Sequence, residues 1–202
     1  MAYAAISFSA LEQPTLAKWN ILGTNDAYFN TQIGANFSSG TTSTVWWEEL
    51  GRTTLGGAGD TISVASFAAR KYLKVQFVFI PSGALNSAIR FNNDSGANYS
   101  YRYETDGSGS NAVAGANNGI VEATGGAFNC YGEIDILNIS SIAKVSRCAP
   151  ATFSNTAASA PSNSFIWNKW ANTSTQITRI DLLNVGAGDF AAGSSLIVLG
   201  HD

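Results

Sequence analysis

Apolar and polar residues alternate along most of the chain from residue 44 onwards. In DTISVASF (60–67), Ile62 and Val64 alternate with polar neighbours, and KYLKVQFVFIP (71–81) is a strongly apolar segment. Successive side chains of a β-strand point to opposite faces of a sheet, so this alternation is typical of strands with a buried face. The pattern therefore predicts β-strands through this region.

Ten segments carry this character, separated by turns rich in glycine, asparagine and serine. They span 44–54, 60–67, 71–81, 87–93, 98–105, 127–139, 141–154, 164–172, 175–186 and 194–200. The tract GSGSNAVAGANNG (107–119) is so poor in bulky apolar residues that we interpret it as a surface loop. Short strands at regular spacing, without long helical periods between them, predict an antiparallel β-sandwich, and within that class a jelly roll, over 44–202.

Residues 1–43 follow a different pattern. Leu16, Trp19 and Leu22 recur at three-residue spacing, which predicts one apolar stripe on a short helix, and Phe29 belongs to a second short turn. A stripe of this length cannot form a core of its own. We therefore expect a helical N-terminal arm, ending in a Gly/Ser/Thr linker, that packs these four side chains on another surface.

The most polar segment, RFNNDSGANYSYRYETDG, raises the question of a binding site. Its NDSG turn (93–96) fits a hairpin loop whose glycine takes a positive φ, and this turn would set Phe91 opposite Tyr99. Tyr99, Tyr101 and Tyr103 then share one face, which we expect to point into the core. The acids and amides do not match the spacing of a calcium loop. If the tyrosines instead face solvent, they suit stacking against a sugar.

The composition of the chain limits the kinds of molecule that we expect it to bind. Charged residues make up 12% of the chain, half of the ~25% usual in soluble domains, and the net charge is −3. The lysines and arginines are scattered, which argues against nucleic-acid binding, while a neutral, hydroxyl-rich surface suits a protein that lies against another protein. The longest apolar run (72–80) is shorter than the ~20 residues of a membrane span, and the first lysine is Lys18, so we expect neither a transmembrane helix nor a signal peptide.

Residues that commonly carry catalysis or bind metals are few. Cys130 and Cys148 lack the spacing of a zinc site, and the single histidine, His201, lies in a tail-like GHD sequence where it is a poor catalytic base. Glu133 and Asp135 are two apart on one predicted strand, so they share a face that we interpret as solvated. We expect no catalytic residue, no cofactor and no metal.

The cysteines and tryptophans leave packing alternatives open. Cys130 and Cys148 suit buried free thiols, but a disulfide forms if they fall opposite each other on a hairpin that turns near 138–141.

Tryptophans occur in two close pairs. Trp46 and Trp47 are adjacent, and Trp167 and Trp170 are three apart, so the members of each pair should face opposite sides of a strand. One member of the first pair is expected in the core. Covering both faces favours sandwich packing or an oligomer.

Several segments resemble structural proteins of tailed bacteriophages. EQPTLAKWNILGTNDAYFNTQIG (12–34) shares Q-P-T, K-W-N with a following leucine, and N-D-A-x-F-N with N-terminal segments of that group. ITRIDLLNVGAGDFAAGSSLIVLG (177–200) is similar to the last hairpin of phage jelly-roll domains, and ELGRTTL (49–55) with ARKYLKVQF (69–77) looks like their opening strands. The resemblance implies a capsid decoration (cement) protein, a head fibre or a tail-fibre component, commonly trimeric. The lack of a long fibrous shaft favours a compact decoration knob.

The residues and the resemblance together predict a non-enzymatic virion protein at the capsid surface. We expect a homotrimer whose arm docks on the major capsid protein or another virion protein through the four apolar side chains named above. An alternative is a glycan- or receptor-binding module of a head or tail fibre, with Tyr101 or Trp170 as contacts. A third hypothesis, a polysaccharide-cleaving enzyme, requires a carboxylate pair in a cleft.

Overall fold

The computed structural model describes residues 46–202, and the expected helical arm with Leu16, Trp19, Leu22 and Phe29 lies outside the described residues. The described part folds into twelve β-strands and forms no helix. It therefore contains no helix that could cross a membrane. The predicted β class is confirmed for this part of the chain.

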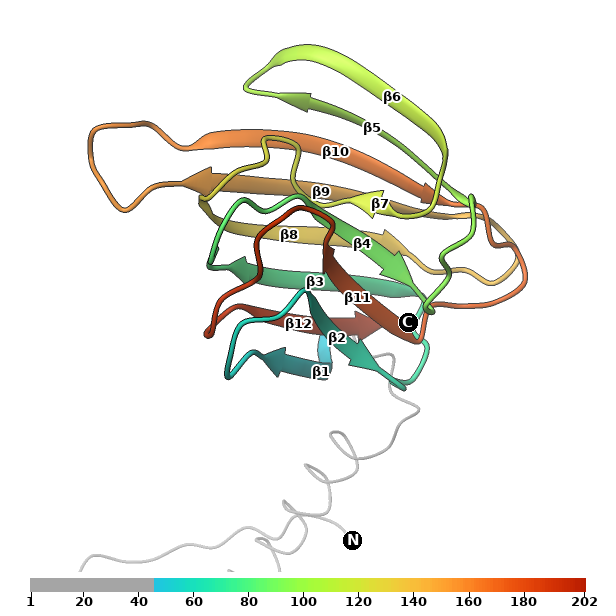
Figure 1. Ribbon diagram of the computed structural model, residues 1–202. Coiled ribbons are helices and arrows are strands. Elements are labelled where there is room, and N and C mark those ends of the chain that lie inside the picture. The colour runs from blue at the N-terminus through green and yellow to red at the C-terminus, as the bar shows by residue number, and fades with distance from the viewer. Residues whose placement is uncertain (1–45) are drawn as a thin grey trace, which may run out of the picture. The chain divides into compact units, whose positions relative to one another are not determined.

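The strands range from two to ten residues in length. In chain order they are β1 (Glu48–Thr54), β2 (Thr61–Ala65), β3 (Tyr72–Phe79), β4 (Ser87–Phe91), β5 (Tyr99–Thr105), β6 (Ser108–Ala116), β7 (Gly119–Ile120), β8 (Asn129–Leu137), β9 (Lys144–Phe153), β10 (Ser162–Trp170), β11 (Arg179–Asn184) and β12 (Ser195–His201). All of them pair antiparallel in two sheets (Figure 1).

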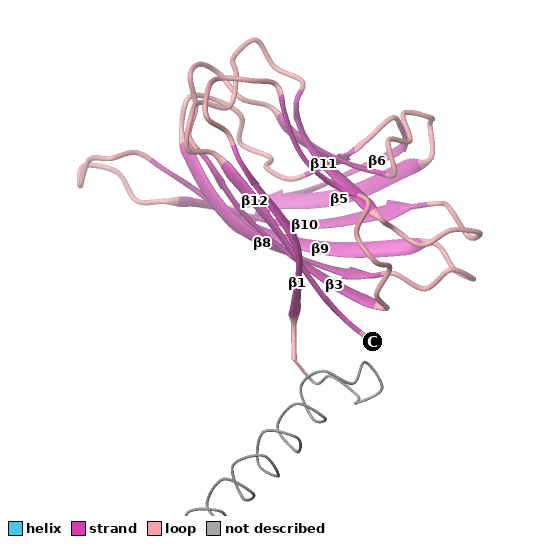
Figure 2. Ribbon diagram, turned by 90° about the horizontal axis from the view of Figure 1, so that it is seen from below, coloured by secondary structure: helices cyan, strands magenta, loops and turns pink. Residues whose placement is uncertain are grey.

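The two sheets form the layers of a sandwich (Figure 2). The larger sheet has the order β1-β12-β3-β8-β9-β10-β5-β6, and the smaller sheet has the order β2-β11-β4-β7. The predicted antiparallel sandwich is therefore present.

Eight of the strands pair as one long nested hairpin. The first pairs with the last and so on inwards, β1 with β12, β2 with β11, β3 with β8 and β4 with β7. The other four strands form the hairpins β5–β6 and β9–β10, which extend the larger sheet beyond β8. This extension gives the larger sheet a wide outer face.

Each of the ten predicted strand segments overlaps an observed strand, but the surface loop predicted over 107–119 is wrong. Most of it forms β6, which pairs along β5 with two register shifts. Gly109 and Gly115 take positive φ values of 63° and 67°, a conformation that glycine adopts without steric cost. Backbone pairing rather than apolar burial makes this strand, so hydrophobic periodicity could not reveal it.

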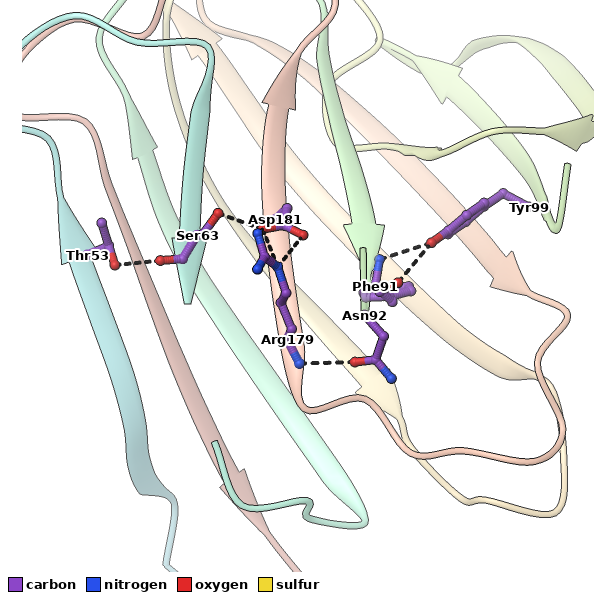
Figure 3. A network of polar contacts seen from close by, with 7 residues as sticks. All are labelled: Thr53, Ser63, Phe91, Asn92, Tyr99, Arg179 and Asp181. Atoms are coloured by element: carbon purple, nitrogen blue, oxygen red, sulfur yellow. Dashed lines mark hydrogen bonds and ion pairs between the residues drawn. The ribbon is translucent and has the colours of Figure 1, made fainter. Parts of the chain in front are cut away.

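The predicted hairpin between the fourth and fifth strands is also wrong. β4 lies in the smaller sheet and β5 in the larger one, so the segment between them crosses from one sheet to the other. The positive φ values fall on Asn92 (50°) and Asn93 (58°) and not on Gly96. Phe91 and Tyr99 still meet, because the Tyr99 hydroxyl accepts a hydrogen bond from the Phe91 N–H at 2.9 Å (Figure 3).

The core fills the space between the sheets. β3 shows the period-two pattern most clearly, since it buries Leu73, Val75, Phe77 and Phe79 and leaves the intervening side chains half-exposed. The Phe79 ring lies between Phe77 and Phe190, at 4.6 and 4.7 Å between centroids. Full burial of a side chain of this size contributes about 1.5–3 kcal/mol to folding.

Cys130 and Cys148 are buried free thiols, as predicted, and the disulfide alternative is not realised. β8 and β9 do form the expected hairpin. Its register sets Cys130 opposite Thr152 and Cys148 opposite Ile134, so the two cysteines are not a cross-strand pair. Burial raises the pKa of both thiols well above the usual range.

Candidate functional site

The outer face of the larger sheet carries a groove with largely aromatic and aliphatic walls. Its volume is about 470 Å³, within the range of sites that hold small ligands. It is lined by Trp47, Tyr72, Leu73, Asp135, Ile136, Leu137, Val145, Arg147, Trp167 and His201. These residues come from β3, β8, β9, β10, β12 and the residue that precedes β1.

Strand periodicity and register bring the walls together. Tyr72, Val145 and Trp167 occupy outward positions, where their neighbours along the strand are buried. Trp167 lies opposite Arg147 on β9, and Arg147 lies opposite Asp135 on β8. The groove therefore depends on the lateral order of strands, several of which are far apart in the sequence.

Three rings form one end of the groove. Trp47 meets the ring of His201 edge-on at 4.5 Å, and Tyr72 stacks on the same ring at 4.9 Å. Lys74 Nζ lies 5.9 Å from the Trp47 ring centroid, within range of a cation–π contact. His201 is thus the last residue of a paired strand with two aromatic neighbours, which corrects the expectation of a loose tail.

A ladder of charges crosses the sheet beside these rings. Lys74 Nζ lies 3.0 Å from Asp135 and 3.2 Å from Glu133, and Arg147 lies 2.6 Å from Asp135. Burial acts to raise the pKa of Asp135, but hydrogen bonds from Arg147 and Lys74 outweigh it, and the pKa is lowered. Hydrogen bonds from Gln76 and Lys74 lower the pKa of Glu133. The two carboxylates are therefore charged partners on one partly exposed face, as predicted.

A second groove adjoins the first on the other side of Trp167. Its volume is about 290 Å³. It is lined by Ser100, Tyr101, Arg102, Ala112, Val113, Val145, Trp167, Asn168 and Lys169. Val145 and Trp167 line both grooves, so they separate one from the other. Trp167 is 44% exposed, and its ring meets Phe165 edge-on at 5.9 Å.

Of the two side chains expected as glycan contacts, Trp170 is buried, whereas Tyr101 is one of the residues that line the second groove. Trp170 is 1% exposed, and its Nε1 donates a hydrogen bond to the Asp94 carboxylate at 2.7 Å, so its ring packs in the core and is closed to ligands. Tyr101 is half-buried on the inner face beside Tyr103, and burial raises its pKa. Of the three tyrosines expected in the core, Tyr99 alone is fully buried.

The tryptophan pairs follow the predicted directions only in part. Trp167 and Trp170 face opposite sides of β10, as expected. Trp46 and Trp47 are 78% and 40% exposed, so the expected core position for one of them is wrong. The reason is that β1 begins at Glu48, and the pair precedes the sheet.

The smaller sheet carries a buried carboxylate in a polar network (Figure 3). Asp181 accepts hydrogen bonds from Ser63 Oγ at 2.5 Å and from Arg179 Nε at 2.9 Å. Thr53 on β1 donates to the Ser63 carbonyl at 2.6 Å, and the Arg179 N–H donates to the Asn92 side chain at 3.1 Å. The network links the edge of the larger sheet to β2 and β11 of the smaller sheet and to the residue that follows β4, so its role is structural.

Lys144 is buried against backbone carbonyl groups. Its Nζ donates to the carbonyl oxygens of Ser140, Ile142 and Asn172, at 3.4, 3.1 and 2.9 Å. Burial lowers its pKa. These hydrogen bonds join two loops, and they engage the Lys144 ammonium group within the protein. Within residues 46–202, no three His, Cys, Asp or Glu side chains gather as a metal site.

Sequence reasoning missed Trp47, Tyr72, Val145 and Arg147 as members of one site. The outward phase of Tyr72, Val145 and Arg147 could be read from the alternation around each of them, whereas Trp47 precedes the first strand. Their proximity could not be read in this way, because it depends on β3, β8, β9 and β10 lying side by side.

No protein-family model, curated protein or solved structure matches this chain.

Proposed function

We propose that the chain is a non-enzymatic virion structural protein, namely a trimeric capsid decoration protein of a tailed bacteriophage. The observation that carries this proposal is the nested pairing of eight strands, first with last through to β4 with β7. We interpret it as the double Greek key of a jelly roll, a fold of viral capsid and lectin domains. The phage-like segments at 12–34 and 177–200 supply the link to the virion.

The surface composition supports a protein that works by contact. Only 12% of residues are charged, and several large apolar side chains are exposed. Tyr131, Val145, Phe165 and Trp167 are among them, all on outward positions of β8, β9 and β10. Exposed apolar surface of this kind usually meets a partner or a ligand.

In the proposed mechanism the arm (1–43) docks on the major capsid protein, and the β domain (44–202) forms a trimeric knob that bridges neighbouring capsid subunits. Each docked copy adds buried interface between subunits, which stabilises the shell.

Deletion of residues 1–36 tests this docking. The truncated chain is expected to fold and to form trimers in analytical ultracentrifugation, but to lose binding to undecorated capsids that the full chain binds. A full-length chain with Trp167→Ala is the matched control, because it alters the outer face of the sheet and keeps the arm intact. Capsid binding that survives the deletion contradicts arm docking.

A second candidate function, glycan recognition by a head or tail fibre, is favoured by the grooves around Trp167. Aromatic walls with a few charged groups are typical of sites that bind polar small molecules. A glycan array without any hit contradicts this candidate.

A further inference from the structure

We propose that Trp167 is the centre of a binding site for acidic oligosaccharides on the outer face of the larger sheet. Arg102, Arg147 and Lys169 surround its ring, and the two grooves lie on either side of it. The inference rests on the second candidate function, for which it names the site and the ligand class. It is independent of capsid docking by the arm.

Trp167 presents an accessible ring in the middle of this face. Its cross-strand neighbours are Arg102 on β5 and Arg147 on β9. Lys169 lies two residues further along β10 and therefore points to the same side. The ring offers apolar surface to the C–H face of a sugar, while the neighbouring cations pair with its carboxylate or sulfate groups.

Two of these cations are available to a ligand. Within the described residues, the Arg102 side chain has one polar contact, a 2.9 Å hydrogen bond to Ser110 Oγ, and Lys169 has no ion pair. Arg147 is already paired with Asp135 at 2.6 Å. An acidic group beside Trp167 would therefore find its strongest partners on β5 and at the end of β10.

The local charge is opposite in sign to that of the whole chain. The net charge is −3, yet three cations flank Trp167, against two neighbouring carboxylates: Asp135, which is paired with Arg147, and Glu104, which lies opposite Phe165. This excess of positive charge favours an acidic sugar over a neutral one. Single-stranded nucleic acid also combines stacking with cation contacts, but the chain lacks the extended basic track that nucleic acid requires.

The two grooves together set the length of the ligand. The first reaches His201 on β12 and the second reaches Ala112 on β6, with β3, β8, β9, β10 and β5 between them. Six inter-strand spacings of about 4.8 Å make this path roughly 29 Å long. A ligand that lies across the strands and fills both grooves is therefore an oligosaccharide of several rings.

An oligosaccharide array tests the site with the full-length chain. It carries oligouronates, sialylated and sulfated oligosaccharides, their uncharged counterparts, and oligothymidylate. We expect hits among the acidic glycans, and the best hit is then titrated by isothermal titration calorimetry, whose signal does not depend on Trp167. Trp167→Ala should weaken its binding about tenfold, and Arg102→Gln should weaken it by a smaller factor that vanishes at high salt.

Trp46→Ala is the matched control, because Trp46 is 78% exposed and lines neither groove. Its affinity should equal that of the wild type. Acidic hits that persist unchanged in Trp167→Ala contradict this site but leave the glycan-binding function standing. An array without acidic hits contradicts the acidic ligand class, and an array without any hit contradicts the glycan-binding function as well. Equal binding to uncharged glycans or to oligothymidylate contradicts the ligand class.

Discussion

At the scale of single residues, the Tyr99 side chain connects the start of β5 to the end of β4, where the sequence predicted a backbone hairpin. Its hydroxyl accepts a hydrogen bond from the Phe91 N–H at 2.9 Å and donates to the Asp94 carbonyl at 3.1 Å. The contact joins the two sheets where the chain crosses between them. Burial raises the pKa of Tyr99 to about 12.

Replacing Tyr99 by phenylalanine should lower the free energy of unfolding at pH 8 by about 1–3 kcal/mol, because the buried Phe91 N–H loses its acceptor. The difference from the wild type should shrink at pH 11. The unfolded chain releases the phenolic proton near pH 10, whereas the folded chain holds it until about 12, so only the wild type loses this stability as the pH rises. Urea unfolding of both proteins at the two pH values measures it, and a constant difference contradicts the assignment.

The two cysteines lead to a prediction about reactivity. Because burial raises their pKa, neither Cys130 nor Cys148 should react with a thiol reagent in the native chain at pH 8. Both should react after denaturation without any reductant. Rapid labelling of the native chain would show that a thiol is accessible, and a denatured chain that fails to react would reveal a disulfide.

At the scale of the elements, the sequence predicted that most of the strands exist, but it did not predict which strand pairs with which. Alternation located every observed strand except β6 and β7, and it located β3 most clearly, because the apolar positions of β3 follow period two without a break. The NDSG turn misled because its local chemistry suits a hairpin, while the folded chain pairs β4 with β11 and β7. The pairing of strands that are distant in the sequence is decided by the burial of a whole sheet face. The sequence of a single turn carries no information about that burial.

We expect β6 to be the least stable strand of the larger sheet. It is an edge strand whose side chains are almost all exposed, and its sequence SGSNAVAGA carries no charge. Hydrogen exchange should therefore be at least about tenfold faster for β6 amides than for those of β3, which has a neighbour on each side. Equal protection of the two strands would mean that another chain covers this edge.

The candidate site shows the same limit of prediction. Trp167 and Trp170 were expected to face opposite ways, and they do. The choice of Trp170 as the ligand contact was wrong because Asp94, from a distant crossing segment, accepts its Nε1 hydrogen and closes it into the core. Which of the two tryptophan rings is accessible depends on which face of β10 is covered, and the position of the second sheet determines that.

At the scale of the whole molecule, the residues that stabilise the sandwich differ from the residues that are accessible to a partner or ligand. The core between the sheets is apolar and aromatic, and the polar networks around Asp181 and Lys144 are satisfied internally. The outer face of the larger sheet instead keeps exposed rings and, among the described residues, two cations without an ion pair, Arg102 and Lys169. We infer that this face recognises a ligand while the arm anchors the molecule, so that one chain combines attachment and recognition.

Imaging of purified phage particles tests the proposed virion assignment most directly. Averaged cryo-electron micrographs should show trimeric knobs of two-layered β density at the capsid surface, and these knobs should be absent from particles made without the chain. Absence of the chain from purified particles, or density confined to the tail, would contradict a capsid decoration protein.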